Sequence, residues 1–533
     1  MKEKEFNLLY EPWIAVLTED GIAEEVGLID VFRRAHKIKM LSGELPTQDV
    51  AILRLLLAVV YAVFLRNDIN GNKAEIEEAD EALERWSSIW NCGYFPSSMI
   101  ETYLKKYEER FYIIHPQRPF CQAHIDKGTE YGVAKLIGEI SESSNKVRLF
   151  STRNGIAKTR ISLSEAARWL IYTNAYDDTS AKPSIRGQNM PSVGAGWLGK
   201  LGLIYASGRT LFETLMLNLI TWDQREDRPF PDGEAIWEMD SPCFEERREI
   251  KTPNNPLSLL TVQSRILMLL HDETGVCGYR LLGGDVFPKE NAFIEKMTLW
   301  RVNKGQTGNE FIPKRHDPAR ALWRDFSSLV AQGEGKNRPG VIDWIEILQE
   351  RGLLPKGIIT FQTASIKYGD KDFFVDDVFY DNITINTQLL TKIGSSVWVP
   401  RIIDAISKTD ECVQRYGRFA MDLAKAGGND EENNLRGVGE NARGEAFFKL
   451  DMPFREWLTS INPDRDDLEL KFAEWIKVLK STLFDCGKKM VVDAGETALV
   501  GRRIKVGEKS IILSAFSAYR SFAISIEKIT RGG

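Results

Sequence analysis

The stretch that decides the fold reads LPTQDVAILRLLLAVVYAVFLR and runs from Leu45 to Arg66. After its first turn it is apolar on nearly every side, which predicts a helix that is buried all round. Thr47 is expected to cap this helix, and Asp49 to complement the positive end of its dipole. The apolar run is too short to span a bilayer and contains Arg54. We therefore expect the central core helix of a large soluble domain.

The composition around this helix is that of an ordinary globular protein. The chain has 533 residues, of which 43% are hydrophobic and 27% charged, and its formal net charge is −6. Nucleic-acid binding would therefore depend on local basic patches. The six cysteines form no C-x-x-C motif, which favours reduced thiols over disulfides or a zinc site. The N-terminus has no apolar signal-peptide region, so we expect a cytoplasmic protein.

The C-terminal part of the chain has a different pattern. From about residue 385 it contains four amphipathic segments separated by Gly, Asn and Pro, the last running from Gly507 to Ile529. These segments predict a four-helix bundle at 385–533. Residues 1–384 combine strand-like and helical patterns, and Ser162 and Thr210 open capping boxes that mark two helix starts. The expected fold class is α+β, a large mixed α/β domain followed by the bundle.

A glycine-rich segment, KPSIRGQNMPSVGAGWLGKLG at 182–202, lies between these two helix starts. Gly194, Gly196 and Gly199 have the G-x-G-x-x-G spacing. A dinucleotide fingerprint needs a strand before the glycines, a helix opening at them and an acidic residue about 20 positions later. Prolines interrupt the preceding residues, and the next helix begins only at Thr210. The sequence therefore argues against a Rossmann fold.

Two segments that flank the helix beginning near Ser162 contain basic residues and no acidic ones. They are residues 143–164, which include Phe150, and residues 179–212, which include the glycines. Basic side chains neutralise phosphates, and glycines let backbone N–H groups approach them. A phenylalanine can stack on bases or wedge between them. We interpret the two segments as a candidate nucleic-acid surface, although a pair of solvated loops explains the same pattern equally well.

Catalytic motifs receive little support. The five histidines form no H-x-H or H-E-x-x-H motif. His271-Asp272 and His316-Asp317 are HD dipeptides without the further ligands of a metal phosphohydrolase. A nucleotide-processing enzyme that uses an HD pair or the glycine-rich loop stays as an alternative, and an assembly scaffold as a third. We expect no cofactor and no metal.

Four motifs occur in an order that is typical of one family. They are NLLYEPWIAV at 7–16, FYIIHPQRPFCQ at 111–122, GWLGKLGLIYASGRTLFETLMLNL at 196–219 and YGDKDFFVDD at 368–377. With the C-terminal bundle, they make the chain resemble, over essentially its whole length, the CasA-type large subunit of the type I-E CRISPR surveillance complex, Cascade.

The resemblance implies a function in antiviral defence without catalysis. Such a subunit binds double-stranded DNA, recognises the protospacer-adjacent motif (PAM) from the minor-groove side and promotes duplex opening for crRNA pairing. It also recruits the helicase-nuclease that degrades the target. The implied partners are the other Cascade subunits, crRNA, target DNA and the helicase-nuclease, with no membrane involved.

The resemblance also implies which residues contact DNA. The PAM loop comprises Phe150, Ser151, Thr152 and Arg153. The glycine-rich loop comprises Arg186, Gly187, Gly194, Gly196, Gly199 and Lys200. The hairpin wedge comprises Tyr368, Gly369, Asp370 and Lys371, and a minor-groove lysine is placed at Lys289.

Two positions depart from the family pattern. Some relatives have a glutamine at the hairpin tip, where this chain has Asp370 and Lys371. An acidic tip near phosphates is unfavourable unless Lys371 offsets it. Some relatives also have paired cysteines that look zinc-binding, whereas Cys277 stands alone.

Overall fold

The structure is a computed structural model. It describes residues 4–531 except 127–128, 143–146, 148, 180–193, 241–248, 306–307, 332–336, 373 and 507–508. The chain divides into two compact units. The first comprises residues 1–322, 332–354 and 359–382, and the second comprises residues 323–331, 355–358 and 383–533.

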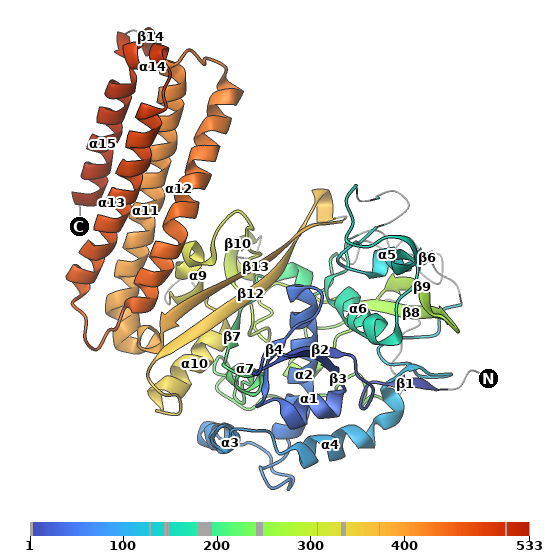
Figure 1. Cartoon of the computed structure of the whole chain (residues 1–533). Helices are drawn as coiled ribbons and strands as arrows, with labels where there is room; N and C mark the ends of the chain where they lie inside the picture. Colours follow the sequence, from blue (N-terminus) through green and yellow to red (C-terminus); the bar gives the residue numbers. More distant parts are fainter. Residues whose placement is uncertain are drawn as a thin grey trace. The chain divides into compact units, whose positions relative to one another are not determined.

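The centre of the first unit is helix α2 (Pro46–Phe64). Every residue of α2 except Pro46 and Asp49 is buried, which confirms the predicted core helix. Its neighbours are four shorter helices: α4 (Ser97–Lys106), α6 (Leu163–Tyr176), α7 (Leu211–Asn218) and α8 (Pro256–Leu260) (Figure 1). Arg54 is the buried cation of α2, and its guanidinium forms a two-pronged ion pair with Glu295 at 2.8 and 2.9 Å.

The predicted cap of α2 is wrong. The helix begins at Pro46 with Leu45 as its N-cap, so Thr47 lies inside the first turn and its hydroxyl has no hydrogen-bond partner within the described part of the chain. The reason is that proline is favoured in the first helical turn, where its missing N–H costs nothing. By length and composition α2 could cross a bilayer, but 94% of its apolar stretch is buried inside the protein, as expected of a core helix.

The strands of the first unit form small sheets around these helices. Three of the sheets have three strands. In the first, β2 (Ile14–Thr18) lies between β3 (Ala23–Val26) and β4 (Ile38–Leu41), and in the second, β12 (Ile358–Tyr368) lies between β13 (Val375–Asn386) and β7 (Tyr205–Ser207). In the third, β9 (Gly275–Gly283) lies between β6 (Thr129–Gly132) and β8 (Arg265–Asp272). Two are strand pairs: β1 (Glu5–Asn7) with β5 (Tyr112–Ile114), and β10 (Trp300–Gly305) with β11 (Gly308–Pro313). Antiparallel pairing and segregated helices define an α+β fold, as predicted.

Helices α6 and α7 begin where the capping boxes predict. The Ser162 hydroxyl accepts the N–H of Glu165 at 3.1 Å, and the Thr210 hydroxyl accepts the N–H of Glu213 at 3.2 Å. Each bond satisfies one of the free N–H groups at the helix start. The other helices of the first unit are α1 (Leu28–Arg34), α3 (Ala79–Cys92), α5 (Val133–Leu136) and α10 (Gly340–Glu350).

The second unit is the predicted bundle. Its four long helices are α11 (Lys392–Ala426), α12 (Glu432–Ser460), α13 (Leu468–Val492) and α15 (Ala515–Arg531) (Figure 1). The short α14 (Glu496–Val500) lies between α13 and α15 in the chain. Helix α11 packs against the other three long helices. Phe454 stacks on Trp323 with ring centroids 4.1 Å apart and meets Trp475 edge-on at 4.8 Å. Trp323 lies just before α9 (Phe326–Val330).

The last predicted helix begins later than expected. Residues Lys509–Leu513 form strand β15, which pairs with β14 (Arg502–Val506), and the helix starts at Ala515. Two adjacent isoleucines, Ile511 and Ile512, favour an extended backbone. The Ser514 hydroxyl then accepts the N–H of Ser517 at 3.2 Å and so marks the helix start.

Candidate nucleic-acid interface

The hairpin predicted around Gly369-Asp370 is present. Strands β12 and β13 are joined by residues 369–374, and the turn at Asp370–Asp372 contains two consecutive non-glycine residues in the left-handed region. The φ angles of Lys371 and Asp372 are 53° and 59°. The side chains of Asp370 and Lys371 are exposed. We call residues 370–372 the hairpin tip.

Three contacts hold the hairpin tip. The Thr179 hydroxyl donates to the carbonyl of Lys371 at 2.7 Å, and the Thr179 N–H donates to the carbonyl of Asp372 at 3.0 Å. The Arg315 guanidinium donates to both carboxylate oxygens of Asp372, at 2.8 and 2.9 Å. A left-handed non-glycine backbone persists only where its surroundings over-determine it, and these contacts do so here.

Tyr368, a predicted wedge residue, has a structural role instead. Its side chain is 8% exposed, and its hydroxyl donates to the carbonyl of Tyr176 at the end of α6 at 2.6 Å. Burial holds the pKa of this hydroxyl well above its usual value. Tyr368 therefore anchors the base of the hairpin.

Close packing explains two glycines of the G-x-G-x-x-G motif. Gly196 and Gly199 are buried. A Cβ at Gly196 would lie 2.3 Å from the Ala175 carbonyl oxygen, and a Cβ at Gly199 would lie 2.1 Å from the Tyr368 hydroxyl. Their predicted place on a surface is therefore wrong, because the missing side chains make room for α6 and the hairpin base.

The third glycine of the motif has a backbone role. Gly194 has a φ of 72°, a conformation that favours glycine, and the residue is partly exposed. The segment that follows forms a single 3₁₀ turn at Leu198–Lys200 and no helix that could open a dinucleotide site. Arg186 and Gly187 lie outside the described residues.

Arg265 binds the chain on both sides of residues 180–193. It is 1% exposed, and its Nε donates to the Asp177 carboxylate at 2.5 Å. Its Nη2 donates to the carbonyl of Asp178 at 2.9 Å and to that of Gly194 at 2.7 Å. One guanidinium therefore fixes the chain both before and after residues 180–193.

Three further basic side chains gather beside this clamp and the hairpin tip. Burial, and then the positive charges of Arg265, Lys289 and Arg315, lower the pKa of Lys200 to about 8. Lys289 is exposed, and the Arg315 side chain is 36% exposed. We call Lys200, Lys289 and Arg315 the cation cluster. A phosphate placed here would relieve the mutual repulsion of these charges.

The predicted PAM loop lies at the other end of α6. Phe150 is 87% exposed, and Ser151 and Thr152 are also exposed or partly so. Arg153, however, pairs with Glu139 at 3.1 Å and with Glu165 of α6. The sequence missed these pairs because both carboxylates lie outside the acid-free stretch, and they reduce the capacity of Arg153 to bind phosphate.

Helix α6 separates the predicted elements into two groups. Its 14 residues correspond to about 21 Å. The glycine-rich segment and the hairpin meet at its C-terminal end, where Tyr176 and Asp177 lie, and Lys289 lies near Lys200 there. The Phe150 loop is tied to its N-terminal end through Glu165.

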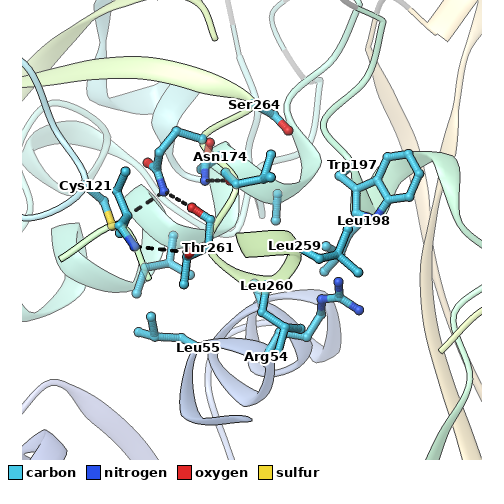
Figure 2. Close-up of a pocket in the computed structure, with 16 residues that line it drawn as sticks. Arg54, Leu55, Cys121, Asn174, Trp197, Leu198, Leu259, Leu260, Thr261 and Ser264 are labelled. Atoms are coloured by element: carbon cyan, nitrogen blue, oxygen red, sulfur yellow. Dashed lines mark hydrogen bonds between the residues drawn. The ribbon is translucent and has the colours of Figure 1, made fainter. Parts of the chain in front are cut away.

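A small cavity lies behind Trp197 and Leu198 (Figure 2). Its volume is about 50 Å³, enough for a few water molecules. Figure 2 shows Cys121 on the side opposite Trp197. Burial raises the pKa of the Cys121 thiol to about 12, so this thiol is not a nucleophile at neutral pH. The cavity is too small for a substrate.

The residues of the enzymatic alternative are engaged structurally. Asp272 pairs with Arg160 at 2.6 Å and accepts from Thr274, and these bonds lower its pKa. A ring nitrogen of His316 lies 2.9 Å from the carbonyl of Leu203. Within the described parts of the chain, no group of three or more His, Cys, Asp or Glu residues is placed to hold a metal.

Sequence reasoning missed three residues of the site: Thr179, Arg265 and Arg315. Arg265 precedes the apolar run ILMLL, and an arginine at the start of a buried strand indicates an internal ion pair. Thr179 and Arg315 show no comparable signal. Their roles depend on contacts with residues 57 to 193 positions away.

Comparison with known proteins supports the family that the four sequence motifs indicate. The family model described as CRISPR-associated protein Cse1 matches residues 7–486. The curated CasA/Cse1 protein of Thermus thermophilus is 28% identical over 340 residues, and the alignment spans 62% of this chain and 62% of that protein.

Solved structures share the fold over nearly the whole chain. Cse1 of Thermobifida fusca has a TM-score of 0.84 and 28% identity, covering 99% of this chain and 98% of that one. A chain of a structure described as a CRISPR RNA-guided surveillance complex has a TM-score of 0.63 and 20% identity, covering 90% of this chain and 100% of that one. The family model alone spans most of the sequence, and the chain belongs to the CRISPR-associated Cse1 family.

Proposed function

We propose that this chain is the non-catalytic large subunit of a type I-E Cascade surveillance complex. It binds double-stranded DNA beside the PAM, promotes duplex opening for crRNA pairing and recruits the helicase-nuclease. Membership of the Cse1 family supports the placement in Cascade, as does the shared fold with a chain of a CRISPR RNA-guided surveillance complex. In such systems base pairing reads most of the sequence and the protein reads a short flanking motif.

The observation that carries this proposal is the cation cluster beside the exposed hairpin tip. Lys200 and Lys289 add positive charge beside the ion pair of Arg315 and Asp372, in a chain whose formal net charge is −6. The acidic residue of the tip that lies nearest to them, Asp372, is neutralised by Arg315. Local positive charge of this kind attracts the phosphates of a duplex without holding every DNA molecule tightly.

The exposed Lys371 side chain offsets Asp370 at the tip. The two side chains are exposed and carry opposite charges, so their net charge is zero. The negative charge of Asp370 is therefore less unfavourable near phosphates than it would be alone. The tip enters the duplex as a small polar turn, and the minor groove allows a limited discrimination between base pairs.

The Phe150 loop supplies a second contact. Leu149 and Phe150 are 88% and 87% exposed, which is unusual for two adjacent large apolar residues. Phe150 stacks on a base or inserts between two bases, and the length of α6, about 21 Å, leaves room for several base pairs between this contact and the hairpin. We also assign a contact with crRNA to this loop.

A band-shift experiment tests the proposed function. Guide-loaded complex with and without this subunit is titrated with a duplex that contains the PAM and with one in which the PAM is mutated. Tighter binding of the PAM duplex only when the subunit is present is expected. Equal affinity for both duplexes in its presence would refute the proposal. Charge reversal at Lys289 serves as the site variant, and charge reversal at the exposed Lys39 serves as its control.

A further inference from the structure

The hairpin tip stores backbone strain that glycine would avoid. Lys371 and Asp372 both lie in the left-handed region, where a Cβ crowds the following carbonyl oxygen. Two neighbouring left-handed residues with side chains are uncommon. Without external contacts this turn would relax toward an ordinary right-handed or extended backbone.

The contacts that oppose relaxation come from outside the hairpin. Thr179 holds the carbonyls of both strained residues, the first through its hydroxyl and the second through its N–H. Arg315 holds the carboxylate of Asp372. Inside the hairpin, the Asp372 N–H donates to the Gly369 carbonyl at 3.0 Å, and the Gly369 N–H donates to the Phe374 carbonyl at 2.9 Å. These two bonds close the turn, and neither uses the carbonyl of Lys371 or Asp372.

Thr179 is itself held in place by the clamp described above. It lies two residues after Asp177, whose carboxylate accepts from Arg265, and one residue after Asp178, which pairs with Lys135 at 3.3 Å. The same Arg265 holds the Gly194 carbonyl. Thr179, the Arg265 clamp and the hairpin tip are therefore parts of one hydrogen-bonded unit.

We propose that Thr179 and Arg315 are positioning residues that latch the hairpin tip in its left-handed conformation. This inference rests on the proposed function for its consequence, because the latched tip is the form that separates the base pairs beside the PAM. Thr179 needs no contact with DNA to affect opening.

Trypsin cleavage after Lys371 measures the latch without DNA. Full-length Thr179→Val loses the hydroxyl bond at nearly constant volume, so its tip opens more often. Cleavage after Lys371, measured by mass spectrometry, is expected to be roughly tenfold faster than in the native chain, which is the effect of losing one hydrogen bond.

Thr179→Ser keeps the hydroxyl and restores slow cleavage. Thr102→Val is the control, because the Thr102 hydroxyl also donates to a carbonyl, that of Ser98. Equal cleavage of Thr179→Val and the native chain would overturn the latch.

Duplex opening in guide-loaded complex separates positioning from general damage. A fully paired target and a target with a mismatched bubble beside the PAM are compared through 2-aminopurine fluorescence and band-shift. Thr179→Val is expected to open the paired target roughly tenfold more slowly while binding the bubble target within about twofold of the native affinity. An equal loss on both targets would overturn the positioning role. If the native complex does not distinguish PAM from mutated PAM, the proposed function fails, while the cleavage result still decides the latch.

Discussion

Asp177 and Arg265 form a buried ion pair, with the Arg265 Nε 2.5 Å from the Asp177 carboxylate. The two side chains are 6% and 1% exposed, so neither charge is solvated by water. Arg265 also donates to four backbone carbonyls, those of Ser264, Asp177, Asp178 and Gly194. This single side chain satisfies polar groups on both sides of residues 180–193.

Replacement of Arg265 is therefore expected to be severe. Arg265→Met leaves the Asp177 carboxylate buried without its partner, and we expect a loss of about 3–5 kcal/mol in the free energy of unfolding. Arg33→Met, which removes an exposed pair with Glu101, is the control and should cost less than about 1 kcal/mol. Denaturant unfolding of both variants checks this. A similar small loss in both would contradict the role of the clamp.

Gly199 tolerates no side chain. In Gly199→Ala the new Cβ falls 2.1 Å from the Tyr368 hydroxyl, and the overpacking should cost about 1–3 kcal/mol. Tyr368→Phe removes that oxygen, so the double variant should lose less than the sum of the single losses. Gly437→Ala, in α12 with open space around it, should be neutral or stabilising. Strict additivity at Gly199 and Tyr368 in thermal unfolding would argue against the clash.

DNA affinity should depend on pH through Lys200. Its pKa of about 8 lies below the ordinary value of 10.5, so above pH 8 the free protein holds this side chain mostly uncharged. A bound phosphate favours the charged form, so binding takes up a proton and affinity falls as pH rises through 8. One proton limits the fall to about tenfold per pH unit. Lys200→Arg keeps the charge and should flatten the profile between pH 7 and 9, measured by fluorescence anisotropy.

Asp49 makes folding stability depend on pH in the opposite sense to a paired carboxylate. Asp49 is half-buried, and desolvation of its carboxyl raises its pKa to about 7, above the unfolded value of 3.8. The folded state therefore holds the proton more tightly, and its stability decreases as pH rises from about 4 to 7. Asp49→Asn removes this penalty, so we expect a gain of up to about 4 kcal/mol at pH 8 and little change at pH 4. Unfolding curves at both pH values measure it, and an equal effect at both would refute the assignment.

Phe150→Ala should weaken target binding and leave folding intact. The side chain is 87% exposed, so its removal creates no cavity. Loss of stacking or insertion should reduce affinity by about 1–3 kcal/mol in guide-loaded complex. Tyr94→Ala, at another exposed aromatic, is the control and should bind normally. Unchanged affinity of Phe150→Ala, with a normal melting temperature, would remove this residue from the interface.

Local patterns were sufficient to predict the core helix α2, helices α6 and α7 and the long helices of the bundle. The continuous apolar run of α2, the hydroxyl caps at Ser162 and Thr210, and the amphipathic periods of α11, α12 and α13 depend on residues within a few turns of one another. The order of the motifs was sufficient to predict the family.

Tertiary structure alone decided which of the predicted site residues are accessible. Gly196, Gly199 and Tyr368 are buried against α6, and Arg153 is paired with carboxylates outside its own loop. The strain at Lys371 and Asp372 also depends on Thr179, which lies 192 positions before Lys371 in the chain. The physical reason is range: periodicity and capping act between neighbours in the sequence, whereas burial, ion pairing and backbone strain depend on groups that only the folded chain brings together.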